Sequence, residues 1–122
     1  MGKWVAAGIL DGALQAIAAA DAMIAVEGQP LDFVSAMSGK LAATAMTAGD
    51  FNLVDGVAGG RRLLIPAKGE VPVSAAGVAD HIALVDTIGG SLLYVTTCPP
   101  RSLSAGGSVS FEAWTVEIGA PV

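Results

Sequence analysis

The fold is decided by the stretch Asp80-His81-Ile82-Ala83-Leu84-Val85-Asp86, then Thr87-Ile88-Gly89-Gly90, then Ser91-Leu92-Leu93-Tyr94-Val95-Thr96-Thr97. The two outer segments are rich in residues that favour strands, and the short segment between them contains two adjacent glycines. This pattern predicts an antiparallel hairpin. Nothing around it resembles an active site, so the hairpin indicates a small β-rich domain without indicating its chemistry.

Outward from the hairpin, the chain begins with one helical pattern and continues with short strands. Leu10, Leu14 and Ile17 recur at helical spacing, which predicts a helix from Ile9 to Ala20. Short strands are expected at 23–27, 33–37, 41–47, 51–54, 61–67, 71–75 and 108–118, although the alanine-rich composition of 31–60 also leaves helix open there. The alternation in 108–118 changes phase, which predicts a bulge near 112–114. The fold class is therefore mainly β, a small antiparallel β-sandwich or open barrel with one N-terminal helix.

The composition predicts one domain that works in an assembly. A chain of 122 residues leaves room for a single core. We expect residues 1–8 to form an N-terminal arm and residues 9–122 to form one β-rich domain. Apolar residues make up 53% of the chain and charged residues only 14%, so apolar surface is expected to remain exposed unless a partner covers it.

Charge and hydropathy argue against two classes of partner. The net charge is −5, and Arg61-Arg62 is the one adjacent basic pair, so nucleic-acid binding is not expected. The apolar N-terminal run loosely resembles a signal peptide, but Asp11 interrupts it after seven residues and Asp21 follows. A folded helix is the better interpretation, and no membrane span is expected.

The residues that could carry chemistry are few. Cys98 and His81 are the one pair that could supply a thiol nucleophile and a base, but no third residue is evident to orient them. Pro99-Pro100 predicts a stiff loop after the cysteine, with nothing to lower the pKa of the thiol. One His and one Cys make a zinc site within one chain improbable. We therefore expect no catalytic residue, no cofactor and no metal, and we do not expect the protein to be an enzyme. A small thiol enzyme is the weakest alternative.

The candidate partner-binding residues are Lys3, Trp4, Val5, Arg61 and Arg62. An apolar arm that carries a tryptophan often anchors on a neighbouring molecule, although packing of Trp4 on its own domain is an equal alternative. The arginine pair could contact acidic groups of a partner or simply be solvated. Trp114, in an alternating strand, is expected in the core.

The stretch from Gly60 to Pro121 resembles a family of small virion structural proteins of tailed bacteriophages. The resemblance is carried by Gly77-Val78-Ala79-Asp80-His81-Ile82-Ala83-Leu84-Val85-Asp86, Leu92-Leu93-Tyr94-Val95-Thr96-Thr97, Leu103-Ser104-Ala105-Gly106-Gly107-Ser108-Val109 and Ala113-Trp114-Thr115-Val116-Glu117-Ile118. The helix Leu10-Asp11-Gly12-Ala13-Leu14-Gln15-Ala16-Ile17 and the following Met23-Ile24-Ala25-Val26 are similar too. Segment 31–48 departs from the pattern, and none of these residues is catalytic.

The resemblance implies a component of the virion, and the composition favours a capsid decoration, or cement, protein. Such a protein would lie on the capsid surface, bind the major capsid protein and associate with itself, with a homotrimer expected. A tail or neck protein that forms rings is the first alternative. A glycan-binding β-sandwich is the second, and it would require aromatic residues such as Trp4, Tyr94 and Trp114 to be exposed.

Overall fold

The computed structural model describes residues 2–121; Met1 of the predicted arm and Val122 of the predicted domain lie outside the described residues. The elements are, in order, α1 (Ala7–Ile17), β1 (Ala22–Val26), α2 (Phe33–Ser38), β2 (Lys40–Ala45), the 3₁₀ turn η1 (Ala48–Asp50), β3 (Asn52–Asp55), β4 (Arg61–Ile65), β5 (Lys68–Pro72), β6 (Gly77–Asp86), β7 (Ser91–Leu103), β8 (Ser108–Phe111) and β9 (Trp114–Ile118). The predicted class is confirmed: the chain is mainly β, with antiparallel sheets and one long helix near the N-terminus.

The predicted hairpin forms one half of the main sheet, at the side that ends in β7. Strands β6 and β7 pair antiparallel, with Asp86 opposite Ser91 at the turn. The Asp86 carboxylate accepts hydrogen bonds from the backbone N–H groups of Ile88 and Gly89, both at 3.0 Å, and Gly90 takes a positive φ of 72°. These bonds fix the turn because they satisfy donors that the sheet cannot reach. The sheet has four strands in the order β2-β1-β6-β7.

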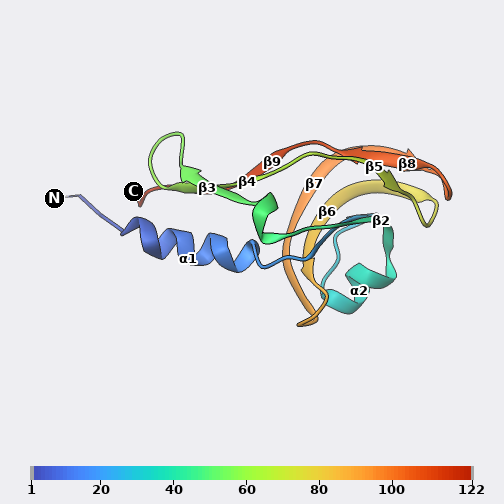
Figure 1. Cartoon of the computed structure of the whole chain (residues 1–122), viewed down its shortest axis with the longest axis horizontal. Coiled ribbons are helices and arrows are strands. Elements are labelled where there is room, and N and C mark those ends of the chain that lie inside the picture. The colour runs from blue at the N-terminus through green and yellow to red at the C-terminus, as the bar shows by residue number, and fades with distance from the viewer. Residues whose placement is uncertain (1, 122) are drawn as a thin grey trace.

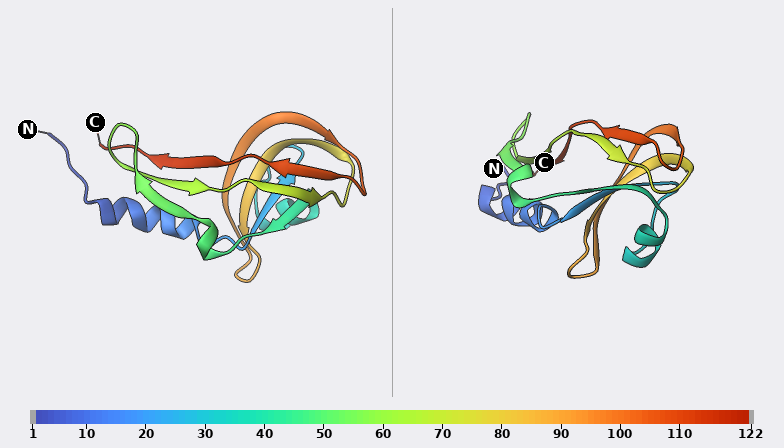
Figure 2. Two further views of the ribbon diagram at one scale, coloured as in Figure 1. Left: turned by 45° about the horizontal axis from the view of Figure 1, so that its top comes forward. Right: turned by 45° about the vertical axis from the view of Figure 1, so that its right-hand side comes forward.

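A long ribbon lies over this sheet and extends beyond it. Strand β4 pairs with β9, and β5, which follows β4 in the chain, pairs with β8, which precedes β9. The β5–β8 half covers the four-stranded sheet, and the β4–β9 half, joined by β3, lies over α1 (Figures 1 and 2). The molecule is therefore elongated, with a sandwich at one end and a helix under three strands at the other.

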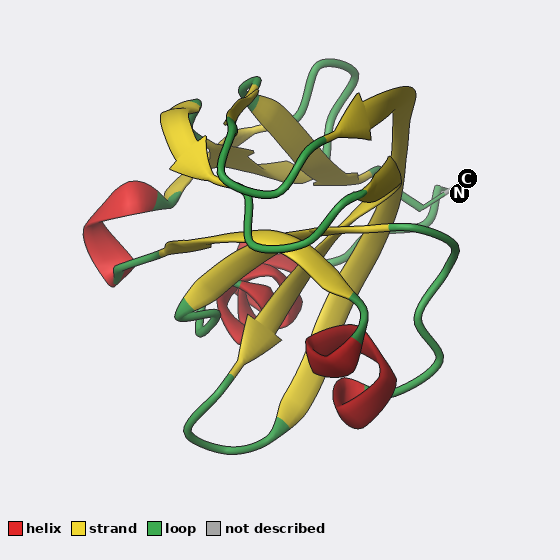
Figure 3. Ribbon diagram, turned by 90° about the vertical axis from the view of Figure 1, so that its right-hand side faces the viewer, coloured by secondary structure: helices red, strands yellow, loops and turns green. Residues whose placement is uncertain are grey.

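The core lies between these layers. Its largest fully buried side chains include Leu14 of α1, Met23 of β1, Leu63 of β4 and Leu84 of β6. Strand β1 is buried on both faces, which explains its continuous apolar run. A second, smaller cluster forms on the outer face of the four-stranded sheet, where α2 packs (Figure 3).

The strand predicted at 33–37 is wrong, because this segment is helix α2. The Asp32 carboxylate accepts from the backbone N–H of Ser35 at 2.8 Å, and the Ser35 hydroxyl accepts from the backbone N–H of Asp32 at 3.2 Å. This reciprocal capping box starts the helix. Phe33, Ala36 and Met37 then fall on one face and pack against the sheet.

Three smaller differences concern element ends. Helix α1 covers Ala7–Ile17 and not Ile9–Ala20, so the last two residues of the predicted arm are helical. The stiff loop predicted at Pro99-Pro100 is part of β7, which tolerates proline because it is the edge strand of its sheet. The phase change in 108–118 is present as a break between β8 and β9 rather than a bulge, and it leaves both Phe111 and Val116 buried.

Candidate functional site

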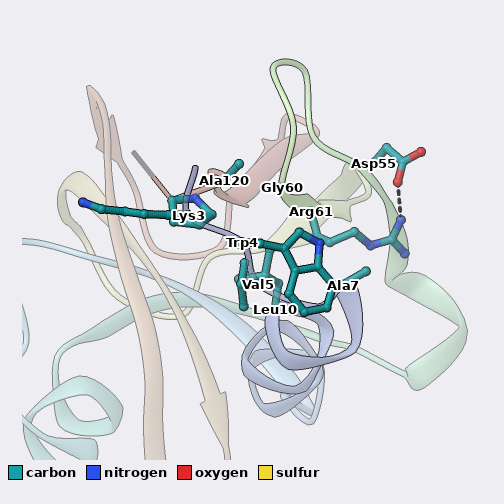
Figure 4. A pocket seen from close by; sticks show the side chains of 10 residues that line it. Lys3, Trp4, Val5, Ala7, Leu10, Asp55, Gly60, Arg61 and Ala120 are labelled. Carbon is teal, nitrogen blue, oxygen red and sulfur yellow. Dashed lines mark hydrogen bonds and ion pairs between the residues drawn. The ribbon is translucent and has the colours of Figure 1, made fainter. Parts of the chain in front are cut away.

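The arm and the first arginine meet at one end of the molecule. Lys3, Trp4, Val5 and Arg61 line a shallow cavity of about 310 Å³ (Figure 4). The remaining lining residues come from α1, the end of β3, the β3–β4 loop and the C-terminal segment: Ala7, Leu10, Asp55, Gly60, Ala120 and Pro121. Four of the five predicted partner-binding residues therefore surround one cavity, although Arg61 lies more than 50 positions from the other three in the sequence.

Arg61 is held by two carboxylates of its own chain. Its Nε atom donates to Asp11 Oδ1 of α1 at 2.7 Å, and its Nη1 atom donates to Asp55 Oδ1 at 2.7 Å. The hydrogen bond to Asp11 raises the pKa of Arg61 above its ordinary value, and the hydrogen bond to Asp55 raises it further by a smaller amount. The guanidinium is thus engaged inside the chain, and its role at the cavity is to join α1 to β4.

Arg62 points to the other side of β4, as the alternation of a strand requires. Its Nε atom donates to the backbone carbonyl of Asp55 at 3.1 Å, and it does not line the cavity. The predicted arginine pair therefore does not act as one basic patch.

Large apolar side chains are exposed beside the cavity. Trp4 is 83% exposed, Ile9 of α1 is 68% exposed and Val57 of the β3–β4 loop is 80% exposed. The start of α1, the β3–β4 loop and both described ends of the chain lie together at this end (Figures 1 and 2). We call Trp4, Ile9 and Val57 the apolar end. Trp4 does not pack into its own domain, which leaves it available to a partner.

The β3–β4 loop that presents Val57 has defined geometry. The backbone N–H of Gly56 donates to the carbonyl of Gly60 at 3.0 Å, and the N–H of Val57 donates to Glu117 Oε2 at 3.2 Å. The sequence patterns did not single out Val57 as a surface residue. The available signal was a single valine within a run of Gly and Ala, 56–60.

His81, one of the two residues considered for thiol chemistry, has a hydrogen-bond partner that the sequence did not reveal. Asp80 Oδ1 lies 2.7 Å from Nδ1 of His81 and also accepts from the backbone N–H of Gly28 at 2.7 Å. The hydrogen bond to His81 lowers the pKa of Asp80 most, and the hydrogen bond from the Gly28 backbone also lowers it. Burial, with a smaller effect of Asp80, raises the pKa of the Cys98 thiol. A raised pKa keeps the thiol protonated, and a protonated thiol is a poor nucleophile.

The aromatic residues named for glycan binding are not exposed together. The rings of Tyr94 and Trp114 lie 5.9 Å apart, and both side chains are half-buried against the main core cluster. Trp114 is thus at the edge of the core rather than fully inside it. A glycan-binding face built on these two rings lacks the exposure it would need.

Within residues 2–121, no group of three or more His, Cys, Asp or Glu side chains is placed to hold a metal ion. The helices in that range are too short or too polar for any of them to cross a membrane.

Comparisons of the chain with protein-family models, with curated proteins and with solved structures found no match.

Proposed function

We propose that this protein is a capsid decoration protein of a tailed bacteriophage. It associates with itself, binds the outer surface of the assembled head and stabilises contacts between major capsid protein subunits. The proposal combines the family resemblance of the sequence with one structural observation, the exposed Trp4 at the apolar end. It makes the protein a structural component of the virion rather than an enzyme.

The apolar end has the properties of a docking surface. A tryptophan buries about 150–250 Å² in an interface, at roughly 25 cal/mol per Å². Because Trp4 is 83% exposed, nearly all of this area remains available for a partner. Arg61 is neutralised by Asp11 and Asp55, so docking on the cavity beside Trp4 would not bury an unpaired guanidinium.

Modest contacts are sufficient on a symmetric shell. Each contact is repeated around the particle, and a homo-oligomer engages several capsid subunits at once, so the effective concentration at the second and third sites is high. A protein that binds the assembled shell and not free subunits stabilises the assembled state by mass action.

The test is to mix the purified protein with expanded and unexpanded shells of the phage that encodes it, and to count bound copies per capsid subunit. Saturable binding to expanded shells at a ratio compatible with their symmetry is the expected result. No binding to shells would overturn the proposal, and rings in solution would then favour the tail or neck alternative.

Two variants test whether Trp4 carries the contact. Trp4→Ser should weaken shell binding at least tenfold, because it removes the anchor side chain. Ile88→Ser is the matched control, since Ile88 is 92% exposed in the β6–β7 turn, away from the apolar end. Equal shell binding by Trp4→Ser and the wild type would show that Trp4 does not anchor the protein on the shell.

A further inference from the structure

Helix α1 has an outer face without charge. Seven of its residues are exposed: Ala7, Gly8, Ile9, Gly12, Ala13, Gln15 and Ala16. None of them is ionisable, and Ile9 is a large apolar side chain at 68% exposure. A helix on the surface of a globular protein normally presents charged residues to water, whereas a helix that is apolar all round is typical of a buried position.

The polarity of α1 is reversed relative to a surface helix. Its one charged residue, Asp11, points toward the domain and pairs with Arg61 of β4 at 2.7 Å. Leu14, also on the inner side, is fully buried. The charge therefore fastens the helix to the domain, and the opposite face is left with small and apolar side chains.

The accessible surface area of the chain is larger than that of a compact monomer of the same mass. A compact monomer of 12.1 kDa would expose about 6,000 Å², but this chain exposes 6763 Å². The surplus of roughly 700 Å² reflects the elongated shape of the chain, which leaves α1 and the arm uncovered by the rest of the domain. Because α1 extends away from the sandwich, its outer face is open to another molecule (Figure 1).

We propose that the outer face of α1 packs against α1 of neighbouring copies of this chain, at the symmetry axis of the homo-oligomer. Gly8, Gly12 and Ala16 lie four residues apart and let helix backbones approach closely, at interaxial distances of about 8 Å. Ile9 fills the space above the glycines of the neighbouring helix. The chain is acidic overall, with a net charge of −5, and α1 offers a face where copies meet without opposing like charges.

The inference rests on the homo-oligomer of the proposed function, but not on what that oligomer binds. The two surfaces adjoin at Ile9, but they can be tested separately, because Trp4 lies on the arm before the helix and Ala13 lies in the middle of the helix. Loss of self-association and loss of shell binding can therefore be measured with different variants.

The experiment measures the mass of the full chain in solution by light scattering and sedimentation equilibrium between about 1 and 100 µM. The variants are Ala13→Glu and Ala13→Lys, and the control is Ala105→Glu in the exposed turn between β7 and β8. Circular dichroism checks that each variant folds. Alanine, glutamate and lysine are all good helix formers, so α1 itself should tolerate the changes.

Both variants at Ala13 should shift the wild-type oligomer to monomer, by at least a hundredfold in dissociation constant, because each would bury an unpaired charge. The opposite signs of Glu and Lys separate this cause from a change in net charge. Ala105→Glu should keep the wild-type mass. A wild-type monomer at 100 µM, or an oligomer that persists in both folded Ala13 variants, would overturn the inference. A wild-type monomer that still binds shells would also overturn the proposed homo-oligomer, and it would leave the shell contact standing.

Discussion

Arg61 Nε donates to Asp11 Oδ1 at 2.7 Å and thereby fastens the N-terminal helix to strand β4. The two side chains are about four-fifths buried, at 20% and 23% exposure. Asp55, the second partner of Arg61, is 92% exposed. The two ion pairs of one arginine therefore differ greatly in their contact with water, and so in their contribution to stability.

We predict an order of destabilisation for three neutralising substitutions. Arg61→Gln should lower the urea midpoint most, because it leaves the largely buried Asp11 carboxylate without its partner. Asp11→Asn should lower the midpoint less, and Asp55→Asn should barely change it. Arg101→Gln, at an exposed arginine of β7, is the control for loss of a positive charge. A larger effect of Asp55→Asn than of Asp11→Asn would contradict this assignment.

The second prediction concerns the stability of the folded chain at low pH. The pKa values of Asp21, Asp32, Asp50 and Asp80 all lie below the ordinary value of 3.8, because hydrogen bonds in the folded chain favour their charged forms. A carboxylate with a lowered pKa contributes stability that is fully present above its unfolded pKa and is lost as pH falls through its folded pKa. The melting temperature should therefore change little from pH 7 to 5 on account of these groups and fall steeply below about pH 4.

Asp21 offers a direct check of this cause. Its carboxylate accepts hydrogen bonds from the Thr87 hydroxyl and from the Thr87 backbone N–H. Both bonds lower the pKa of Asp21, and the bond from the hydroxyl has the larger effect. Thr87→Val removes the hydroxyl and keeps the shape and the backbone donor. Its melting temperature should fall less steeply than that of the wild type between pH 4 and pH 2. Parallel curves for the two proteins would show that Asp21 does not contribute as described.

The third prediction concerns the single cysteine. Burial raises the pKa of the Cys98 thiol, so at pH 7.5 little of it is thiolate. Labelling by a disulfide reagent should be at least several-fold slower in the folded chain than in the same chain in urea. Cys98→Ser supplies the background rate. Folded-state labelling as fast as in urea would mean that the thiol is an exposed, activated group.

Part of the fold could be predicted from local sequence patterns. Residues 80–97 contain the parts of β6 and β7 next to the turn, together with the turn residues that join them, so the hairpin was predictable. Helix α2 was not assigned, although Asp32 and Ser35 carry its start signal, because six residues give too short a period to separate helix from strand. The extent of β7 through Pro99 depends on its being an edge strand, which only the tertiary arrangement decides.

The candidate site was predictable only in its residue types. The arm residues Lys3, Trp4 and Val5 were apparent from their apolar setting, but their meeting with Arg61 depends on how α1 packs under β4. The pairing of Arg61 with Asp11 joins positions 50 residues apart, and no local pattern predicts it. For the same reason, the uncharged outer face of α1 became apparent only once its inner face was known.

The last prediction tests the backbone beneath the cavity. Gly60 has a positive φ of 73°, and a Cβ atom at this position would overlap the backbone carbonyl oxygen of Ile118. Gly60→Ala combines strain with a clash and should destabilise the chain by about 1–3 kcal/mol or more. Gly119→Ala is the matched control, because a Cβ there meets no heavy atom within 4 Å, and it should stay within about 0.5 kcal/mol of the wild type. Urea unfolding of both variants measures the difference. Equal stability of the two would mean that the β3–β4 loop and the C-terminal segment do not approach each other as they do here, and the cavity that they form with Trp4 would lose its support.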